Sequence, residues 1–192
     1  MSHPLPSSQA AQAGTTQPLV KQPAPEVTLR PWARADAEAF LRLAGDREIW
    51  LNLRERFPHP LTLPAAELWL ADHIDARPPV TAFAVLAGGE LAGGVNLRRR
   101  EEPHAICADL TFWVGRPFWG RGIATGAVRA ATAYAFDTLG LERVQAFVYD
   151  WNAASSHVLE HAGFTFEGRL RRYVLKDGRS ADALLYAKLR SE

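Results

Sequence analysis

The stretch over residues 109–125 constrains the fold of this chain more than any other part of the sequence. Apolar residues alternate with other residues over 110–114, which is the two-residue period of a strand with two different faces. Pro117 cannot continue a strand ladder, and over residues 122–139 apolar residues recur every three or four positions, as on one face of a helix. The stretch therefore predicts a strand, a tight turn and a long helix in immediate succession.

Two glycines, Gly120 and Gly122, occupy the turn before this helix. The first four backbone N–H groups of a helix have no partner within it, and glycine leaves them open to a ligand. The turn is therefore suited to an anion such as phosphate or pyrophosphate, although the same glycines also serve a plain bend. The P-loop lysine is absent, and the third glycine of the dinucleotide fingerprint, expected at Thr125, comes one residue late. A phosphate-bearing ligand outside these two classes is predicted.

The composition is that of a globular domain without a general preference for polyanions. A chain of 192 residues with 47% hydrophobic and 22% charged residues fits one domain with a substantial core. Its net charge of +1 predicts no general attraction to nucleic acid or to membranes. The only basic run, residues 98–100, is followed at once by two glutamates, so we interpret it as a solvated strand end and loop.

Cysteine content and the N-terminal sequence bear on the location of the protein. Cys107 is the only cysteine, so no intrachain disulfide forms and a reducing compartment is expected. No stretch has the length and hydrophobicity of a secretory signal or a membrane span, and we predict a cytoplasmic protein. Residues 1–25 are rich in Ser, Gln, Ala and Pro, a composition that predicts a disordered tail before a single domain over residues 26–192.

Periodicity and turn signals along the chain predict one α/β (α+β) domain, a mixed sheet with helices on both faces. The helices are delimited by capping residues such as Asp46, Thr62 and Asn152 and by glycines or prolines at their ends. Turn residues at 88–90 and 176–179 indicate two hairpins. The expected strands cover residues 27–30, 81–87, 91–97, 109–114, 143–149, 165–175 and 183–189, and the expected helices 37–44, 47–53, 63–74, 122–139 and 152–162.

The run over residues 108–125 resembles the acetyl-CoA-binding motif of the GNAT N-acetyltransferase superfamily. It is most similar to the branch that includes the ribosomal-protein N-terminal acetyltransferases of RimJ and RimL type. Other matches follow in the order and spacing of that family, and together they cover the chain from residue 28 to near its end. They are Leu141-Glu142-Arg143-Val144, Asn152 with Ser155, Val158-Leu159-Glu160, Gly163-Phe164 before Glu167-Gly168, Asp177-Gly178-Arg179, Asp182 and Tyr186.

This resemblance implies a fold, an activity and a cofactor. The sheet is expected to be mostly antiparallel, with residues 107–114 and 143–149 as splayed middle strands and acetyl-CoA wedged between them. The activity implied is transfer of an acetyl group to a primary amine by direct attack in a ternary complex, without a covalent acetyl-enzyme. The implied cofactor contacts are the backbone of Trp113 and Val114 for pantetheine, the turn residues Trp119, Gly120, Arg121, Gly122, Ala124 and Thr125 for pyrophosphate, and Asn152 and Ser155 for the pantetheine arm and the sulfur.

Two positions depart from the family pattern. Trp119 stands where the loop usually opens with Gln or Arg, as is frequent in the RimJ and RimL type. Leu159 stands where many members carry a tyrosine general acid, so Ser155 becomes the candidate proton donor to the departing thiolate. Ser155 is equally an ordinary residue of a first helical turn, and both interpretations are kept.

The acceptor amine must lose a proton, and Asp109 is the carboxylate best placed to accept it. The same branch often carries Glu at this position, and Asp, which is one carbon shorter, would act through a water. The alternative for Asp109 is a structural or substrate-orienting carboxylate. Cys107 is not expected to act as a nucleophile.

Other function classes stand beside acetyl transfer. His157, Glu160 and His161 match His-x-x-Glu-His, a metal-binding pattern, but the helix ends at Gly163 and too little chain follows for a further ligand-bearing domain. No metal is therefore expected. A GNAT-like module that binds acyl-CoA without turnover is a further alternative.

The acceptor is the part of the activity that the sequence leaves open. The resemblance implies the α-amino group of a protein or peptide, with small amines or amino-modified antibiotics as the alternative. The expected partners are thus acetyl-CoA and an amine acceptor, without direct contact to nucleic acid or membrane, and a homodimer is considered. The helices within residues 46–76 and the terminal hairpin are expected to form the acceptor cleft.

Overall fold

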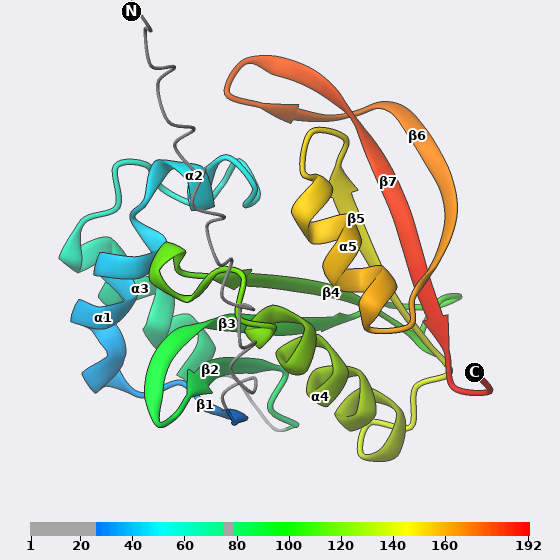
Figure 1. The fold of residues 1–192 in the computed structure, drawn as a ribbon, viewed down its shortest axis with the longest axis horizontal. Helices are drawn as coiled ribbons and strands as arrows, with labels where there is room; N and C mark the ends of the chain where they lie inside the picture. Colours follow the sequence, from blue (N-terminus) through cyan, green and yellow to red (C-terminus); the bar gives the residue numbers. More distant parts are fainter. Residues whose placement is uncertain (1–25, 75–78) are drawn as a thin grey trace, which may run out of the picture.

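The computed structural model describes residues 26–74 and 79–192 (Figure 1). The tail predicted over residues 1–25, and the prolyl end predicted for the third helix at residue 78, lie outside the described residues. One seven-stranded sheet of order β1-β2-β3-β4-β5-β7-β6 runs through the described part of the chain. None of the described helices is long and apolar enough to cross a membrane.

All neighbouring strands of the sheet are antiparallel except β4 and β5, which are parallel. The mixed, mostly antiparallel sheet that the resemblance implies is therefore confirmed. The strands are β1 (Val27–Pro31), β2 (Ala82–Ala87), β3 (Glu90–Arg99), β4 (Cys107–Val114), β5 (Arg143–Tyr149), β6 (Thr165–Lys176) and β7 (Arg179–Leu189). The helices are α1 (Ala37–Ala44), α2 (Arg47–Trp50), α3 (Leu63–Ile74), α4 (Ile123–Asp137) and α5 (Ala153–His161), with 3₁₀ turns at Arg34–Asp36 and Arg116–Phe118.

The middle of the sheet forks. β4 and β5 pair only from Cys107 with Arg143 to Asp109 with Gln145. Beyond that point β4 still pairs with β3 and β5 still pairs with β7, so the two strands diverge while each keeps its outer neighbour. Figure 1 shows β4 and β5 running in different directions from their common end. The splayed middle strands are thus confirmed, and the facing backbone edges of the fork are left without strand partners.

Helices cover both faces of the sheet, as predicted. On one face Phe83 of β2 packs edge-on against Tyr134 of α4, with ring centroids 5.2 Å apart. On the other face Trp113 of β4 packs against Phe40 of α1, with centroids 5.7 Å apart. Gly94 lies opposite Trp113 on β3, and a Cβ there would lie 2.8 Å from the indole Nε1, so only glycine lets this tryptophan lie against the sheet.

Small residues let α4 pack closely on the sheet. Ala127, Ala131 and Ala135 are buried at helical spacing, as the sequence predicts, together with larger side chains at Ile123 and Val128. Burial of each of the two larger side chains contributes about 1.5–3 kcal/mol of transfer free energy. The helix begins one residue later and ends two residues earlier than predicted, at residues 123 and 137, and a glycine of positive φ follows at residue 140.

The second predicted helix is also shorter than expected. Its expected range is 47–53, but α2 ends at Trp50. Its start is as predicted, because the Asp46 side chain accepts from the backbone N–H of Glu48 at 2.8 Å. The indole N–H of Trp50 donates to the carbonyl of Phe57 at 2.9 Å, and this bond fixes the chain after α2 in an irregular path.

The hairpin of β6 and β7 curls over the sheet toward α2 (Figure 1). Two register shifts in β6, one of them over 170–174, bend it. At its tip Lys176 lies 3.5 Å from the centre of the Trp50 ring and 3.4 Å from Glu55, and Asp177 pairs with Arg47 at 3.0 Å. The hairpin tip and the α2 region therefore close one side of the molecule together.

Candidate active site

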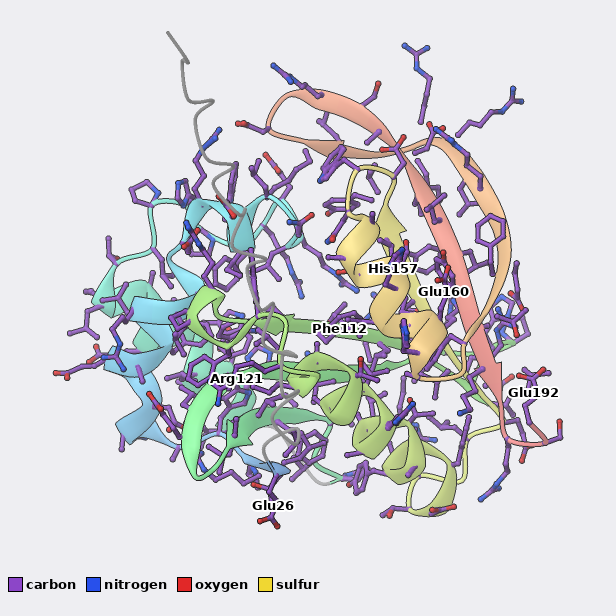
Figure 2. The ribbon with its side chains drawn as sticks, in the orientation of Figure 1. Glu26, Phe112, Arg121, His157, Glu160 and Glu192 are labelled. Atoms are coloured by element: carbon purple, nitrogen blue, oxygen red, sulfur yellow. The ribbon has the colours of Figure 1, made fainter. Side chains whose placement is uncertain are left out.

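A cleft of about 1030 Å³ opens at the fork of β4 and β5. Consecutive residues of β4, from Thr111 through Phe112 to Trp113, all line it, so the cleft passes between the strands rather than over one face of the sheet. Figure 2 marks Phe112 on this part of β4. The other walls come from β3, β5, β6, α3, the start of α5 and the segment between α2 and α3.

Asp109 lies at the closed end of the fork and is 3% exposed. Its Oδ1 accepts from Nε2 of Gln145 at 2.9 Å, and its Oδ2 accepts from Arg98 at 2.5 Å. Arg100 pairs with the same carboxylate at 3.4 Å. A buried carboxylate is tolerated when its oxygens are hydrogen-bonded and its charge is balanced, and these three donors meet both conditions. Asp109 thus joins β3, β4 and β5 at the point where β4 and β5 separate.

The arginine run at 98–100 does more than the sequence interpretation allows. That interpretation makes it a solvated strand end and loop, but Arg98 and Arg100 both bind Asp109 and line the cleft. The reason is the register of β3 and β4, which sets Arg98 directly opposite Asp109 on the same face of the sheet.

The first turn of α5 brings two predicted residues to the same cleft as Asp109. Asn152 caps the helix as predicted, because its Oδ1 accepts from the backbone N–H of Ser155 at 3.1 Å. This bond uses only the carbonyl oxygen, so the side-chain NH₂ of Asn152 remains as a donor. Ser155 is half-buried, and both residues line the cleft.

The glycine turn before α4 has the backbone that the sequence predicts. Gly120 and Gly122 have φ of 71° and 75°, values that favour glycine over residues with a Cβ. Gly122 is the N-cap, and no side chain caps the helix, so the first N–H groups, including those of Ala124 and Thr125, are not used by a cap. A Cβ on Gly120 would meet nothing within 4 Å, which leaves space beside the turn. The turn therefore fits the pyrophosphate of a coenzyme A moiety.

Side chains around this turn fix its position. The indole N–H of Trp119 donates to the carbonyl of Val114 at 2.6 Å and so fastens the turn to the end of β4. A carbonyl oxygen has two lone pairs, so this bond leaves Val114 able to accept another. The guanidinium of Arg121 lies 5.6 Å from the ring centre of Phe118, and Figure 2 shows Arg121 just before α4.

Sequence reasoning missed several residues that line the cleft or bind its lining. Gln145 binds Asp109, and the hydroxyl of Tyr149 donates to the carbonyl of Leu53 at 3.2 Å. Burial raises the pKa of Tyr149 above its ordinary value of 10.0. Phe147 stacks on Tyr173 of β6 with ring centroids 5.6 Å apart. Strand alternation puts Gln145, Phe147 and Tyr149 on one face of β5. A glutamine among apolar strand residues was the signal available in the sequence.

The His-x-x-Glu-His pattern of α5 has other contacts. The Glu160 carboxylate accepts from the hydroxyl of Tyr186 at 3.1 Å, and Nδ1 of His161 lies 2.7 Å from the carbonyl of His157. Figure 2 shows His157 and Glu160 on α5. The described residues contain no group of three His, Cys, Asp or Glu side chains placed to hold a metal ion.

A parallel pair of strands that forks beside an uncapped, glycine-led helix N-terminus is the arrangement that the resemblance to GNAT acetyltransferases implies. Residues 26–165 match the family model described as acetyltransferase (GNAT) domain. The chain therefore belongs to the GNAT acetyltransferase family and is an acetyl-CoA-dependent N-acetyltransferase of that family.

Relatives of this chain include acetyltransferases named for different acceptors. The L-amino acid N-acetyltransferase AaaT of Escherichia coli is 24% identical over 166 residues, which cover 86% of this chain and 99% of AaaT. The structure of Mycobacterium smegmatis RimJ in complex with CoA-disulfide is 26% identical with a TM-score of 0.79, over 88% of this chain and 84% of RimJ. The spermidine N-acetyltransferase of Vibrio cholerae, in complex with CoA and spermine, is 26% identical with a TM-score of 0.72, over 86% and 96% of the two chains.

Proposed function

We propose that this protein transfers the acetyl group of acetyl-CoA to the α-amino group of a protein or peptide by direct attack in a ternary complex. The observation that carries the proposal is the cleft of about 1030 Å³ through the fork, because it brings Ser155, Asn152 and Asp109 to one space between two unpaired strand edges. A volume of this size is at the upper end of sites for small ligands and is suited to a thioester arm together with several residues of a peptide. The 32% identity over 108 residues, 56% of this chain, to the putative ribosomal N-acetyltransferase YdaF of Bacillus subtilis also supports a protein or peptide acceptor.

The residues for holding acetyl-CoA fall into two groups. The open edge of β4 at Trp113 and Val114, with the side-chain NH₂ of Asn152, offers donors and acceptors to the amides of the pantetheine arm. The turn residues Gly120, Arg121, Gly122, Ala124 and Thr125 offer backbone N–H groups, and Trp119 fixes that turn. Bound acetyl-CoA supplies the thioester: as the acceptor amine forms the C–N bond to its carbonyl carbon, the C–S bond breaks, and the proton that the amine releases passes to water.

Ser155 is proposed to donate its hydroxyl proton, as a hydrogen bond or in full, to the sulfur that leaves. Its place in the first turn of α5 supports this role, because the N-terminal end of a helix favours negative charge. Leu159, at the position where many relatives carry a tyrosine, is fully buried, so it takes no part in proton transfer.

For Asp109 the sequence leaves two roles, and its contacts support the orienting role. The carboxylate balances the charge of Arg98 and Arg100, and accepting a proton from an ammonium would weaken both ion pairs. We propose that Asp109 holds these two arginines and Gln145 at the closed end of the fork, beside the reacting groups. General base action through a water is the competing role, and the pH dependence of an Asp109 variant separates the two.

CoA release and product mass together test the proposed function. The protein is incubated with acetyl-CoA and, in separate reactions, peptides of varied N-terminal residue, free amino acids, spermidine and aminoglycosides. We expect turnover with peptides, acetylated at the α-amino group, and a large loss of turnover in Ser155→Ala. The small-amine alternative is supported by the names of AaaT and the spermidine enzyme, and turnover of small amines alone would replace the peptide acceptor.

Ser156 offers a matched control for Ser155. In the described structure its buried hydroxyl has no hydrogen-bond partner, so Ser156→Ala removes one hydroxyl from the same turn without removing a bond. We expect Ser156→Ala to keep the wild-type turnover. Equal losses in both variants would show that the helix start, rather than the Ser155 hydroxyl, is responsible.

A further inference from the structure

Positive charge exceeds negative charge in the walls of the cleft. Four arginines line the cleft on the α1 side of the sheet or above that side. Arg54 and Arg56 come from the segment after α2, and Arg98 and Arg100 come from the end of β3 and the residue that follows it. Arg99 also borders the cleft, but strand alternation turns its side chain toward the opposite face. Among the described residues, the acidic side chains that line the cleft are Asp72 and Asp109.

Only part of this positive charge is balanced within the described chain. Asp109 is shared by Arg98, at 2.5 Å, and Arg100, at 3.4 Å. No described carboxylate lies at salt-bridge distance from Arg54 or Arg56. Burial, together with repulsion from Arg98 and Arg56, lowers the pKa of Arg54, and attraction to Asp109 opposes this shift only in part. An anion placed among them would relieve this repulsion.

The segment that carries Arg54 and Arg56 is fixed over the open end of the fork. The hydroxyl of Tyr149, the last residue of β5, donates to the carbonyl of Leu53 at 3.2 Å. The indole N–H of Trp151 donates to Oδ1 of Asn52 at 3.1 Å. These two bonds tie both residues before Arg54 to the end of β5, so the backbone of this segment is placed by the fold, while the Arg54 side chain is exposed at the cleft.

The turn suited to the pyrophosphate of coenzyme A lies apart from these arginines. The turn suited to pyrophosphate covers residues 119–125, and none of those residues is among the described lining of the cleft. Arg98 and Arg100 lie instead at the closed end of the fork, next to Asp109. The cleft arginines and the phosphate turn are therefore two separate regions of the molecule.

We propose that the acceptor carries carboxylates close to the amine that is acetylated, in the form of an acidic peptide N-terminus bound by Arg54 and Arg56. Guanidinium groups bind carboxylates through paired hydrogen bonds, and the low-dielectric walls of a cleft strengthen this attraction. A polyamine would meet repulsion in the same place. A free amino acid offers the same carboxylate chemistry but fills a small part of a cleft of about 1030 Å³. This inference rests on the proposed function, because it specifies the acceptor of that site.

Peptides that differ only in charge test this proposal. Wild-type protein is given acetyl-CoA and C-terminally amidated peptides Ser-Glu-Glu-Phe, Ser-Gln-Gln-Phe and Ser-Lys-Lys-Phe, and kcat and KM are measured at two salt concentrations. We expect kcat/KM for the glutamate peptide to exceed that for the glutamine peptide by about tenfold, mainly through KM, with a smaller advantage at high salt. Preference for the lysine peptide, or for spermidine, would overturn the proposal.

Arginine variants locate the effect. Arg54→Gln is expected to remove about fivefold of the glutamate advantage, measured as the ratio of kcat/KM for the glutamate peptide to kcat/KM for the glutamine peptide. The matched control is Arg42→Gln, an exposed arginine on α1 that does not line this cleft. Equal effects of Arg54→Gln on all three peptides, or an effect of Arg42→Gln as large as that of Arg54→Gln, would contradict the assignment.

Two further arms separate this inference from the proposed function. Free L-serine is compared with L-serinamide, and a glutamate peptide labelled at its C-terminus is titrated against protein saturated with CoA, with fluorescence anisotropy as the readout. Turnover of L-serine but not of serinamide or peptides would show that the carboxylate belongs to a free amino acid. This result would overturn the peptide acceptor and leave acetyl transfer itself standing. Arg54-dependent binding of the glutamate peptide without any turnover supports the inference and contradicts the proposed function. No preference over the lysine peptide in binding or turnover overturns the inference.

Discussion

Asp109→Asn removes the charge at the closed end of the fork and keeps the shape of the side chain. Loss of one partner of a fully buried ion pair costs about 3–5 kcal/mol. The side chains of Arg98 and Arg100 are 60% and 36% exposed, so water can solvate the released guanidinium groups and the full figure does not apply. A loss of about 1–2 kcal/mol of unfolding free energy is expected after this discount.

The measurement is urea unfolding at pH 7, followed by circular dichroism. Asp109→Asn should lower the midpoint without changing the slope of free energy against urea, because the surface exposed on unfolding is the same. For a domain of this size the loss corresponds to a fall in Tm of about 2–8 °C. Asp72→Asn is the matched control, because Asp72 is an exposed aspartate that lines the same cleft. Its unfolding free energy should stay within about 0.5 kcal/mol of wild type.

The same variant separates the two roles of Asp109 in activity. The orienting role predicts a rise in acceptor KM and a pH profile of unchanged shape. A general base role predicts a fall in kcat of about 100-fold or more, with loss of the acidic limb of the profile. Wild-type stability of Asp109→Asn, or an equal loss in Asp72→Asn, would refute the view that this carboxylate holds β3, β4 and β5 together.

Three other predictions concern the thiolate donor, the phosphate turn and the buried lysine. Ser155→Ala should lower kcat by about 100-fold while KM for acetyl-CoA changes little, as measured by CoA release; an unchanged kcat would exclude the proton-donor role. Gly122→Ala should cost about 1–2 kcal/mol in urea unfolding, because its φ is 75°, and should raise KM for acetyl-CoA; wild-type values of both would show that the turn tolerates a Cβ. Burial lowers the pKa of Lys176 from 10.5, so just below pH 10.5 the unfolded chain binds a proton that the folded chain does not, and stability rises with pH in that range. The unfolding free energy of Lys176→Met should lack this rise with pH. A pH dependence equal to that of the wild type would contradict the argument.

Local features of the sequence were enough to predict most of the fold. The alternation of β4, the glycines before α4 and the Asn152 cap all depend on residues a few positions apart, and the structure has each of them where it was expected. Some of the boundaries that failed depend on contacts outside the element itself. The end of α2 at Trp50 is one example, because its indole N–H binds the carbonyl of Phe57.

The cleft was predictable only in part, because its residues converge from separate elements. Asp109, Asn152 and Ser155 could be named from their place on the central strand and the later helix. The bond from Gln145 to Asp109 joins residues 36 positions apart, and the bond from Tyr149 to Leu53 joins residues 96 positions apart. No local sequence pattern predicts either bond. Arg54 lies in an irregular segment without periodicity, so its position near the fork became visible only in the fold.

Single-turnover acetylation with intact-mass analysis tests the central claim most directly. Protein in excess over acetyl-CoA is mixed with the glutamate peptide, and the masses of protein, peptide and CoA are followed over time. Direct transfer at the fork predicts that the peptide gains one acetyl group on its α-amine as CoA is released in equal amount, while the protein mass never changes. An acetylated protein that forms before the peptide is added, or a product acetylated away from the α-amine, would contradict it.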